Sequence, residues 1–170
     1  EIILNHAADR MEFVVDAPTE VLKLLSEKRL GARFRCVTGI STGNDRLHLS
    51  TNPRPGFTLP FYKNPGSRRF YCPPNAYLRD DFLELAKDQP NFLVRNRDLL
   101  FEPGISCSSM GVTFGAIYMP RGATWGVNAN VFPAAEDRWW LLSYLNSHIA
   151  SYLVRGVLNR SNMVTSGYIA

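Results

Sequence analysis

The chain has 170 residues, of which 45% are hydrophobic and 12% aromatic, so it can bury a core and form one domain, with room for a small subdomain. Its formal net charge of +4 and pI of about 9.1 permit contact with a polyanion without requiring it. Its three cysteines form no C-x-x-C pair and have no histidine at metal-ligand spacing, which argues against a disulfide framework and a zinc site.

The N-terminal part is expected to be a connection followed by a short helix. Because the chain starts at Glu1 without Met and stops at Ala170 after an apparent strand start, we expect a piece of a longer protein. Residues 1–35 form the connection, and residues 18–30 predict a helix with an acidic first turn. The core face of that helix is expected to be Val21, Leu24 and Leu25.

Residues 36–170 are expected to form the main domain. Residues 34–37 alternate with arginines and predict a strand, which a polar turn at 38–45 connects to a second strand at 47–49. Residues 52–75 contain six of the 11 prolines together with aromatics, which indicates an irregular but well-packed surface segment.

The second half of the chain predicts a sheet and a long helix. A short helix at 76–87 should end before Pro90, and residues 92–132 read as several strands separated by glycines. Residues 138–158 repeat apolar side chains at spacings of three and four, so a helix should pack on that sheet. Its polar side chains argue against a membrane span. The fold class is therefore α+β, with a mixed, mostly antiparallel sheet and packed helices.

Motifs of catalysis are absent from the sequence. It has no phosphate-binding loop, no nucleophile elbow and no H-E-x-x-H motif, and its histidines are scattered. A hydrolase using His48 or His148 would need a carboxylate or nucleophile beside one of them, which nothing nominates. Asp80, Asp81 and Glu84 are interpreted as a solvated surface. We therefore expect that the chain catalyses no reaction by itself.

A basic and aromatic segment is the first candidate for binding nucleic acid. Lys63, Arg68 and Arg69 can pair with phosphates, and the neighbouring rings can pack along a backbone or a base. The same composition also fits a solvated basic loop over aromatic core residues. The rings are Phe61, Tyr62, Phe70 and Tyr71.

Two polar loops are further candidates for contacts with DNA. Thr42, Asn44 and Arg46 suit base edges, since Asn can pair with adenine and Arg with guanine, although an ordinary turn would have the same composition. Ser106 and Ser108 could reach phosphates or bases, and could as well cap strand ends.

The order of several short motifs carries a resemblance to a known family. The motifs are Gly-Ile-Ser-Thr-Gly-Asn-Asp-Arg at 39–46, Pro-Phe-Tyr-Lys-x-x-Gly-x-Arg-Arg-Phe-Tyr at 60–71, Arg95-Asn96, Gly-Ile-Ser-Cys-Ser at 104–108, Leu-Leu-Ser-Tyr-Leu-Asn-Ser at 141–147 and Asn-Arg-Ser-Asn at 159–162. From about residue 36 onward this series resembles the C-terminal target-recognition region of the gamma-class adenine-specific DNA methyltransferases, including fused type II restriction-methylation enzymes and phage-defence BREX methylases.

The resemblance implies a domain that recognises a sequence in double-stranded DNA. Such a domain closes one side of a DNA cleft and presents the target adenine to a catalytic domain of the same parent chain, where S-adenosylmethionine binds. It implies Lys63, Arg68 and Arg69 at the DNA backbone and Thr42, Asn44 and Arg46 in the DNA-facing loop. The resemblance also implies a restriction-modification system in the cytoplasm of a bacterium or archaeon, and no membrane contact.

Two other classes stay open from the sequence. One is the recognition domain of a type I restriction specificity subunit, which would be distinguished by coiled-coil spacers. The other is a β-rich module that binds carbohydrate or protein through exposed rings, for which the burial of Trp125, Trp139 and Trp140 is the discriminating observation.

Overall fold

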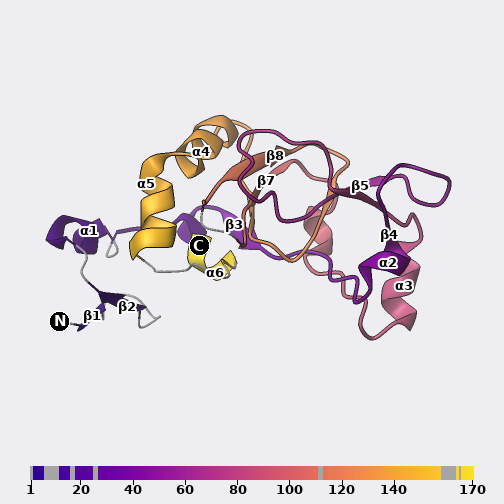
Figure 1. Cartoon of the computed structure of the whole chain (residues 1–170), viewed down its shortest axis with the longest axis horizontal. Coiled ribbons are helices and arrows are strands. Elements are labelled where there is room, and N and C mark those ends of the chain that lie inside the picture. The colour runs from indigo at the N-terminus through magenta and orange to yellow at the C-terminus, as the bar shows by residue number, and fades with distance from the viewer. Residues whose placement is uncertain are drawn as a thin grey trace.

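The protein is α+β, with two four-stranded sheets, one antiparallel and one mixed, and three main helices. The computed structural model describes residues 2–5, 12–15, 18–24, 27–110, 113–157, 164 and 166–170. Figure 1 shows an elongated molecule in which α1 (Thr19–Leu24) lies at one end and α2 (Asp45–His48) at the other, with the antiparallel sheet between them. The expected fold class is therefore confirmed.

The antiparallel sheet is built mostly from the glycine-punctuated second half of the chain. Its strands are β3 (Arg35–Val37), β7 (Gly104–Cys107), β8 (Ala116–Met119) and β10 (Asn130–Phe132), in the order β3-β10-β7-β8. All of β7 is buried, so this strand forms the centre of the largest core. Helix α4 (Arg138–Leu145) packs on β7 and β8, as expected for a helix with an apolar face.

The mixed sheet has one strand inside the proline-rich segment at 52–75 and two strands that flank it. Its strands are β4 (Leu49–Ser50), β5 (Leu59–Tyr62), β6 (Ala76–Leu78) and β9 (Thr124–Trp125), in the order β4-β6-β5-β9. Only the pair β5 and β9 is parallel. A separate apolar cluster lies under this sheet, where α3 (Phe82–Asp88) contributes buried Phe82.

The prediction of one continuous helix at 138–158 is wrong. Helix α4 ends at Leu145, a short α5 covers His148–Ser151, and a π-helical turn follows at Tyr152–Val157. The break has a specific cause, because the buried amide of Asn146 turns to the sheet. Its Oδ1 accepts from the Ala116 backbone N–H at 3.0 Å, and its Nδ2 donates to the Ala116 carbonyl at 2.8 Å.

The break also redirects the apolar face of this region. Leu141, Leu142 and Leu145 are buried as predicted, but Ile149 is 62% exposed. Helix α5 then starts after Ser147, whose hydroxyl accepts a hydrogen bond from the Ala150 backbone N–H at 3.1 Å, as an N-cap residue typically does. The predicted helix end at residues 159–162 lies outside the described residues.

Two shorter elements differ from the sequence prediction. Residues 45–48 form α2, so the predicted strand at 47–49 begins only at Leu49. Residues 76–78 form β6 rather than the start of a helix, since they pair with both β4 and β5. Pairing on both sides outweighs the weak helical preference of this segment.

The N-terminal region contains a hairpin that the sequence did not predict, between β1 (Ile2–Asn5) and β2 (Glu12–Val15). The predicted helix is present but shorter, as α1. Two 3₁₀ turns, at Leu30–Ala32 and Arg97–Leu99, and a last helix, α6 (Ser166–Ile169), complete the described elements. Of the predicted core face, Val21 is half-buried, while Leu25 and the side chain of Leu24 lie outside what the structure describes.

All three cysteines are free thiols, as expected. Burial raises the pKa of the Cys36 thiol to about 11 and raises that of Cys107 further. Among the described residues, no helix is both long enough and apolar enough to cross a membrane, and no cluster of metal-binding side chains occurs.

Candidate functional site

The candidate site begins with a chain segment that extends the mixed sheet. Gly39 N–H donates to the Gly126 carbonyl at 2.9 Å, and Ile40 N–H donates to the Trp125 carbonyl at 2.9 Å, so residues 39–40 run beside β9. Only glycine fits at position 39, because a Cβ there would lie 2.6 Å from the indole nitrogen of Trp125. The close approach of this backbone to the sheet fixes the loop that follows.

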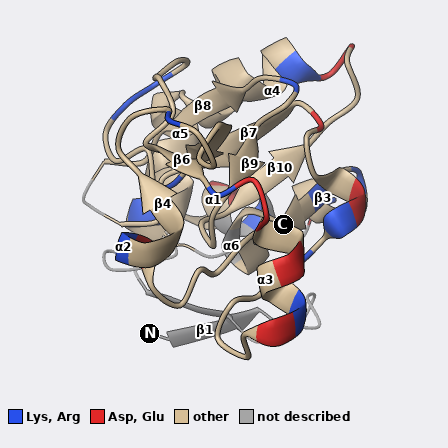
Figure 2. Cartoon of the chain, turned by 90° about the vertical axis from the view of Figure 1, so that its right-hand side faces the viewer, with Lys and Arg blue, Asp and Glu red and all other residues tan. Residues whose placement is uncertain are grey.

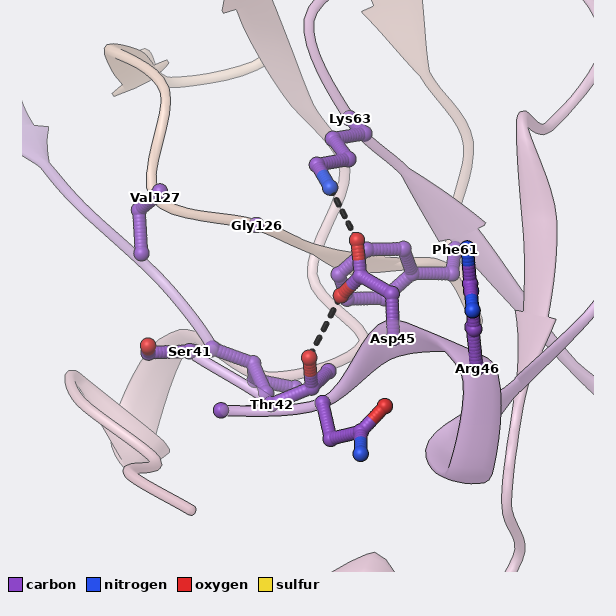
Figure 3. A pocket seen from close by; sticks show the side chains of 11 residues that line it. Ser41, Thr42, Asp45, Arg46, Phe61, Lys63, Gly126 and Val127 are labelled. Atoms are coloured by element: carbon purple, nitrogen blue, oxygen red, sulfur yellow. Dashed lines mark hydrogen bonds and ion pairs between the residues drawn. The ribbon is translucent and has the colours of Figure 1, made fainter. Parts of the chain in front are cut away.

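This loop opens into a hollow of about 610 Å³ at the end of the mixed sheet (Figure 3). The wall combines the loop itself with residues of β5 and of the segment after β9. The residues that line it are Ile40, Ser41, Thr42, Gly43, Asn44, Asp45, Arg46, Phe61, Lys63, Gly126 and Val127.

Asp45 is the centre of the polar contacts in this cavity. Thr42 Oγ1 donates to Asp45 Oδ1 at 2.5 Å, and Lys63 Nζ forms an ion pair with Asp45 Oδ2, as the dashed lines in Figure 3 show. Burial raises the pKa of Asp45, but the hydrogen bonds from Lys63 and Thr42 and the charge of Lys63 outweigh it, so the pKa is lowered. The carboxylate is therefore ionised at neutral pH and ties Lys63 to the loop.

Asn44 and Arg46 flank this carboxylate and remain available to a ligand. Asn44 is the N-cap residue of α2, yet its side chain makes no capping hydrogen bond. Both side chains are exposed, and Arg46 has no ion pair among the described residues. The start of α2 thus presents an amide and a guanidinium to the cavity, one on either side of Asp45 in the sequence.

Four of the residues predicted from the sequence meet here. Thr42, Asn44, Arg46 and Lys63 all line the cavity, although Lys63 is 17 positions beyond Arg46 in the chain. Thr42 is only 6% exposed and its hydroxyl is bound to Asp45, so it positions the loop rather than facing a ligand.

Arg68 and Arg69 lie in a different place, beside β8. Phe70 N–H donates to the Ala116 carbonyl at 2.8 Å, and Tyr118 N–H donates to the Phe70 carbonyl at 2.9 Å, which fixes this segment along the sheet. Arg68 is exposed and Arg69 half-buried, and neither lines the cavity.

The neighbouring rings divide into two groups. Phe61 and Tyr62 are core residues, each 2% exposed, whereas Phe70 and Tyr71 are 52% and 71% exposed. Phe61 and Tyr62 are therefore core residues, as the alternative interpretation of this segment predicted. Phe70 and Tyr71 stay accessible to a ligand beside the two arginines.

Ser106 and Ser108, expected as possible DNA contacts, are structural in this fold. Both are 0% exposed. The Ser106 hydroxyl accepts from Asn128 Nδ2, and the Ser108 hydroxyl accepts from the Gly115 backbone N–H at 2.9 Å. Both hydroxyls are thus hydrogen-bonded inside the protein, as buried polar groups usually are. Neither serine lines the cavity.

His48 is a core residue. It is 3% exposed, its ring meets Phe92 edge-on at 4.9 Å, and burial lowers its pKa. Its Nδ1 has no hydrogen-bond partner among the described residues. His148 lies exposed at the start of α5.

Two of the three tryptophans are exposed and could contribute to an aromatic binding surface. Trp125 is fully buried, while Trp139 and Trp140 on α4 are 58% and 45% exposed. Trp140 is held in place, since its Nε1 donates to Asp137 Oδ1 at 2.8 Å, and Arg33 forms an ion pair with the same carboxylate.

The charges around the site are interleaved and not of one sign. In Figure 2, α2 and α3 each carry both blue and red residues. Asp45 was not among the predicted site residues, and no feature of the sequence places it opposite Lys63. Comparison with protein-family models finds no match, and a search of curated proteins finds none either.

Proposed function

We propose that this chain binds double-stranded DNA and recognises its sequence through the cavity formed by residues 40–46, Lys63 and the segment after β9. The observation that carries the proposal is that Asn44 and Arg46 are exposed, both line the cavity, and neither side chain has a polar partner among the described residues. Asn pairs bidentately with adenine and Arg with guanine in the major groove.

The surroundings of Asn44 and Arg46 support a role in recognising DNA bases. Gly39 and the contact of Thr42 with Asp45 hold the loop on the mixed sheet, so little ordering is needed when a ligand binds. Lys63 supplies a positive charge at the rim for a phosphate group, with Asp45 as its partner in the free protein.

The chain would serve as the target-recognition domain of an adenine-specific DNA methyltransferase or fused restriction-modification enzyme. Two segments that carry the resemblance to that family, residues 39–46 and 60–63, meet at the cavity. Extruding a base costs a few kcal/mol, which contacts to DNA outside the catalytic centre must supply. Methyl transfer from S-adenosylmethionine belongs in this proposal to a separate catalytic domain of the parent chain, and this chain catalyses nothing itself.

The proposal places the parent enzyme in the cytoplasm, which suits the three free thiols. The recognition domain of a type I restriction specificity subunit would use the same surface for the same purpose. The two differ in whether the protein copurifies with a methyltransferase chain or contains one.

The experiment is fluorescence anisotropy of the 170-residue chain with a short random-sequence DNA duplex at low salt. The double variant Asn44→Ala/Arg46→Ala should weaken binding by about tenfold or more, because two groups facing DNA are lost. Lys28→Ala is the matched control, because it removes an exposed positive charge that does not line the cavity.

Equal weakening by Asn44→Ala/Arg46→Ala and Lys28→Ala would mean that only net charge matters, and it would contradict a site at the cavity. Absence of binding by the wild-type chain would contradict the proposal as a whole.

A second candidate function is the binding of a carbohydrate or protein by the rings of α4. The exposed Trp139 and Trp140 favour it. Quenching or a shift of tryptophan fluorescence in a screen of soluble oligosaccharides, lost in Trp139→Ala, would support this function. An unchanged emission spectrum would leave DNA binding as the better account.

A further inference from the structure

A second segment runs beside the loop of the cavity and is held to it by backbone hydrogen bonds. Ser41 N–H donates to the Leu93 carbonyl at 2.9 Å, and Leu93 N–H donates to the Ser41 carbonyl at 2.8 Å. The two segments are antiparallel at this bridge. Residues 91–95 therefore add another edge to the layer formed by β5, β9 and residues 39–41.

Contacts on both sides of this bridge keep the same register. Gly43 lies so close to Asn91 that a Cβ on the glycine would be 2.7 Å from the Asn91 carbonyl oxygen, and Gly43 has a φ of +67°. In the other direction, Arg95 Nη1 donates to the Gly39 carbonyl at 3.5 Å. Positions 43 and 39 thus face positions 91 and 95, two residues to either side of the bridge.

Side chains along this second segment alternate between the core and solvent. Phe92 is 1% exposed and meets His48 of α2, and Val94 packs against the same apolar cluster. Asn91, Leu93 and Arg95 are exposed. The Phe92 contact fixes the segment to α2, the element that carries Arg46.

The exposed residues of the second segment share one face of the layer with Ser41. Opposite residues of an antiparallel pair project their side chains to the same face, and so do residues two apart on one strand. Ser41 lines the cavity, and Leu93 is its partner. Asn91 and Arg95 therefore project to the same side as Leu93, next to the rim of the cavity.

Arg95 is, like Arg46, an exposed arginine without an ion pair among the described residues. Arg35, Arg79 and Arg121 each form an ion pair with a carboxylate. Arg95 has no such pair among the residues that the structure describes, and it contacts only a backbone carbonyl. Its positive charge is thus available to a phosphate group at little cost.

We propose that Asn91, Leu93 and Arg95 form a second DNA-contacting edge, so that a duplex lies across both this edge and the cavity. Arg95 contacts a phosphate, and Asn91 and Leu93 reach base edges, where an amide can pair with adenine and an apolar side chain can contact the methyl group of thymine. This inference rests on the proposed function and extends it with residues that determine specificity.

The test combines a salt series with sequence selection, using the 170-residue chain. Arg95→Ala should weaken binding about fivefold near 0.15 M salt and make the slope of log K against log salt shallower by about one, whereas Lys28→Ala should leave the slope unchanged. Asn91→Ala and Leu93→Ala should keep the slope and lose the preference for one base each in duplexes selected by the wild-type chain. All three side chains are exposed, so the melting temperature should stay within about 2 °C of wild type.

The two proposals fail in different ways. If the wild-type chain binds DNA and Asn44→Ala/Arg46→Ala weakens it while Arg95→Ala behaves as Lys28→Ala and base preferences persist in Asn91→Ala and Leu93→Ala, the second edge is wrong and the cavity stands. If the wild-type chain binds no duplex at low salt, both proposals are overturned.

Discussion

Replacing Asp45 by Asn should tighten DNA binding, because the carboxylate of Asp45 neutralises Lys63 in the free protein. The amide keeps an acceptor for Thr42, so the loop should retain its shape. The two ion-paired side chains are 49% and 47% exposed, so loss of the pair should lower the free energy of unfolding by no more than about 1 kcal/mol. Lys63 then contacts phosphate without first giving up this ion pair, and about 1 kcal/mol corresponds to roughly fivefold tighter binding.

Anisotropy with a random-sequence duplex, read beside a urea denaturation curve, measures both effects. Glu102→Gln is the matched control, since it also removes one half-exposed carboxylate and frees an arginine, Arg121, from its ion pair. Weaker binding by Asp45→Asn with unchanged stability would refute the reasoning, because the carboxylate itself would then have to contact the DNA.

Three further predictions concern the fold and the rival function. Burial lowers the pKa of His48 below its ordinary value of 6.5, so the unfolded chain binds more protons and stability should fall as the pH drops from 7.5 to 5.5. His48→Gln should flatten that dependence in thermal melts, and a parallel decline would contradict it. Asn146→Ala should cost about 2 to 3 kcal/mol in urea denaturation, since it strips partners from the Ala116 backbone, and the exposed Ser143→Ala should cost almost nothing. Trp139→Ala should leave the affinity for duplex DNA within twofold of wild type, and a larger loss would place α4 in the DNA surface.

Periodicity predicted the parts of the fold whose burial follows from local sequence. Leu141, Leu142 and Leu145 recur at helical spacing and are buried on the sheet as expected. The helix break at Asn146 could not be predicted, because it depends on a backbone group of Ala116 that lies 30 positions earlier. Residues 76–78 show the same limit, since β6 is decided by its two neighbouring strands.

Four of the eight site residues predicted from residue type line the candidate cavity. Thr42, Asn44, Arg46 and Lys63 were selected as polar or basic side chains, and the fold brings them to one cavity. The serine hydroxyls at 106 and 108 were selected on the same grounds, but strand pairing buries them. Burial of a short polar segment depends on its partners in the sheet and not on its own composition.

The second edge was not predicted because its placement comes from a distant pairing. Leu93 meets Ser41 across 52 positions of sequence, and nothing local to residues 91–95 indicates that partner. Once the bridge is known, the alternation of Asn91, Leu93 and Arg95 with buried residues follows from strand geometry.

The measurement that tests the central claim most directly is a salt series of the wild-type chain with a random-sequence DNA duplex. The account predicts binding at low salt and a linear fall of log K with log salt, with a slope of about −2 for the phosphate contacts of Lys63 and Arg95. No binding at low salt, or binding that does not change with salt, would contradict the claim that this surface holds DNA.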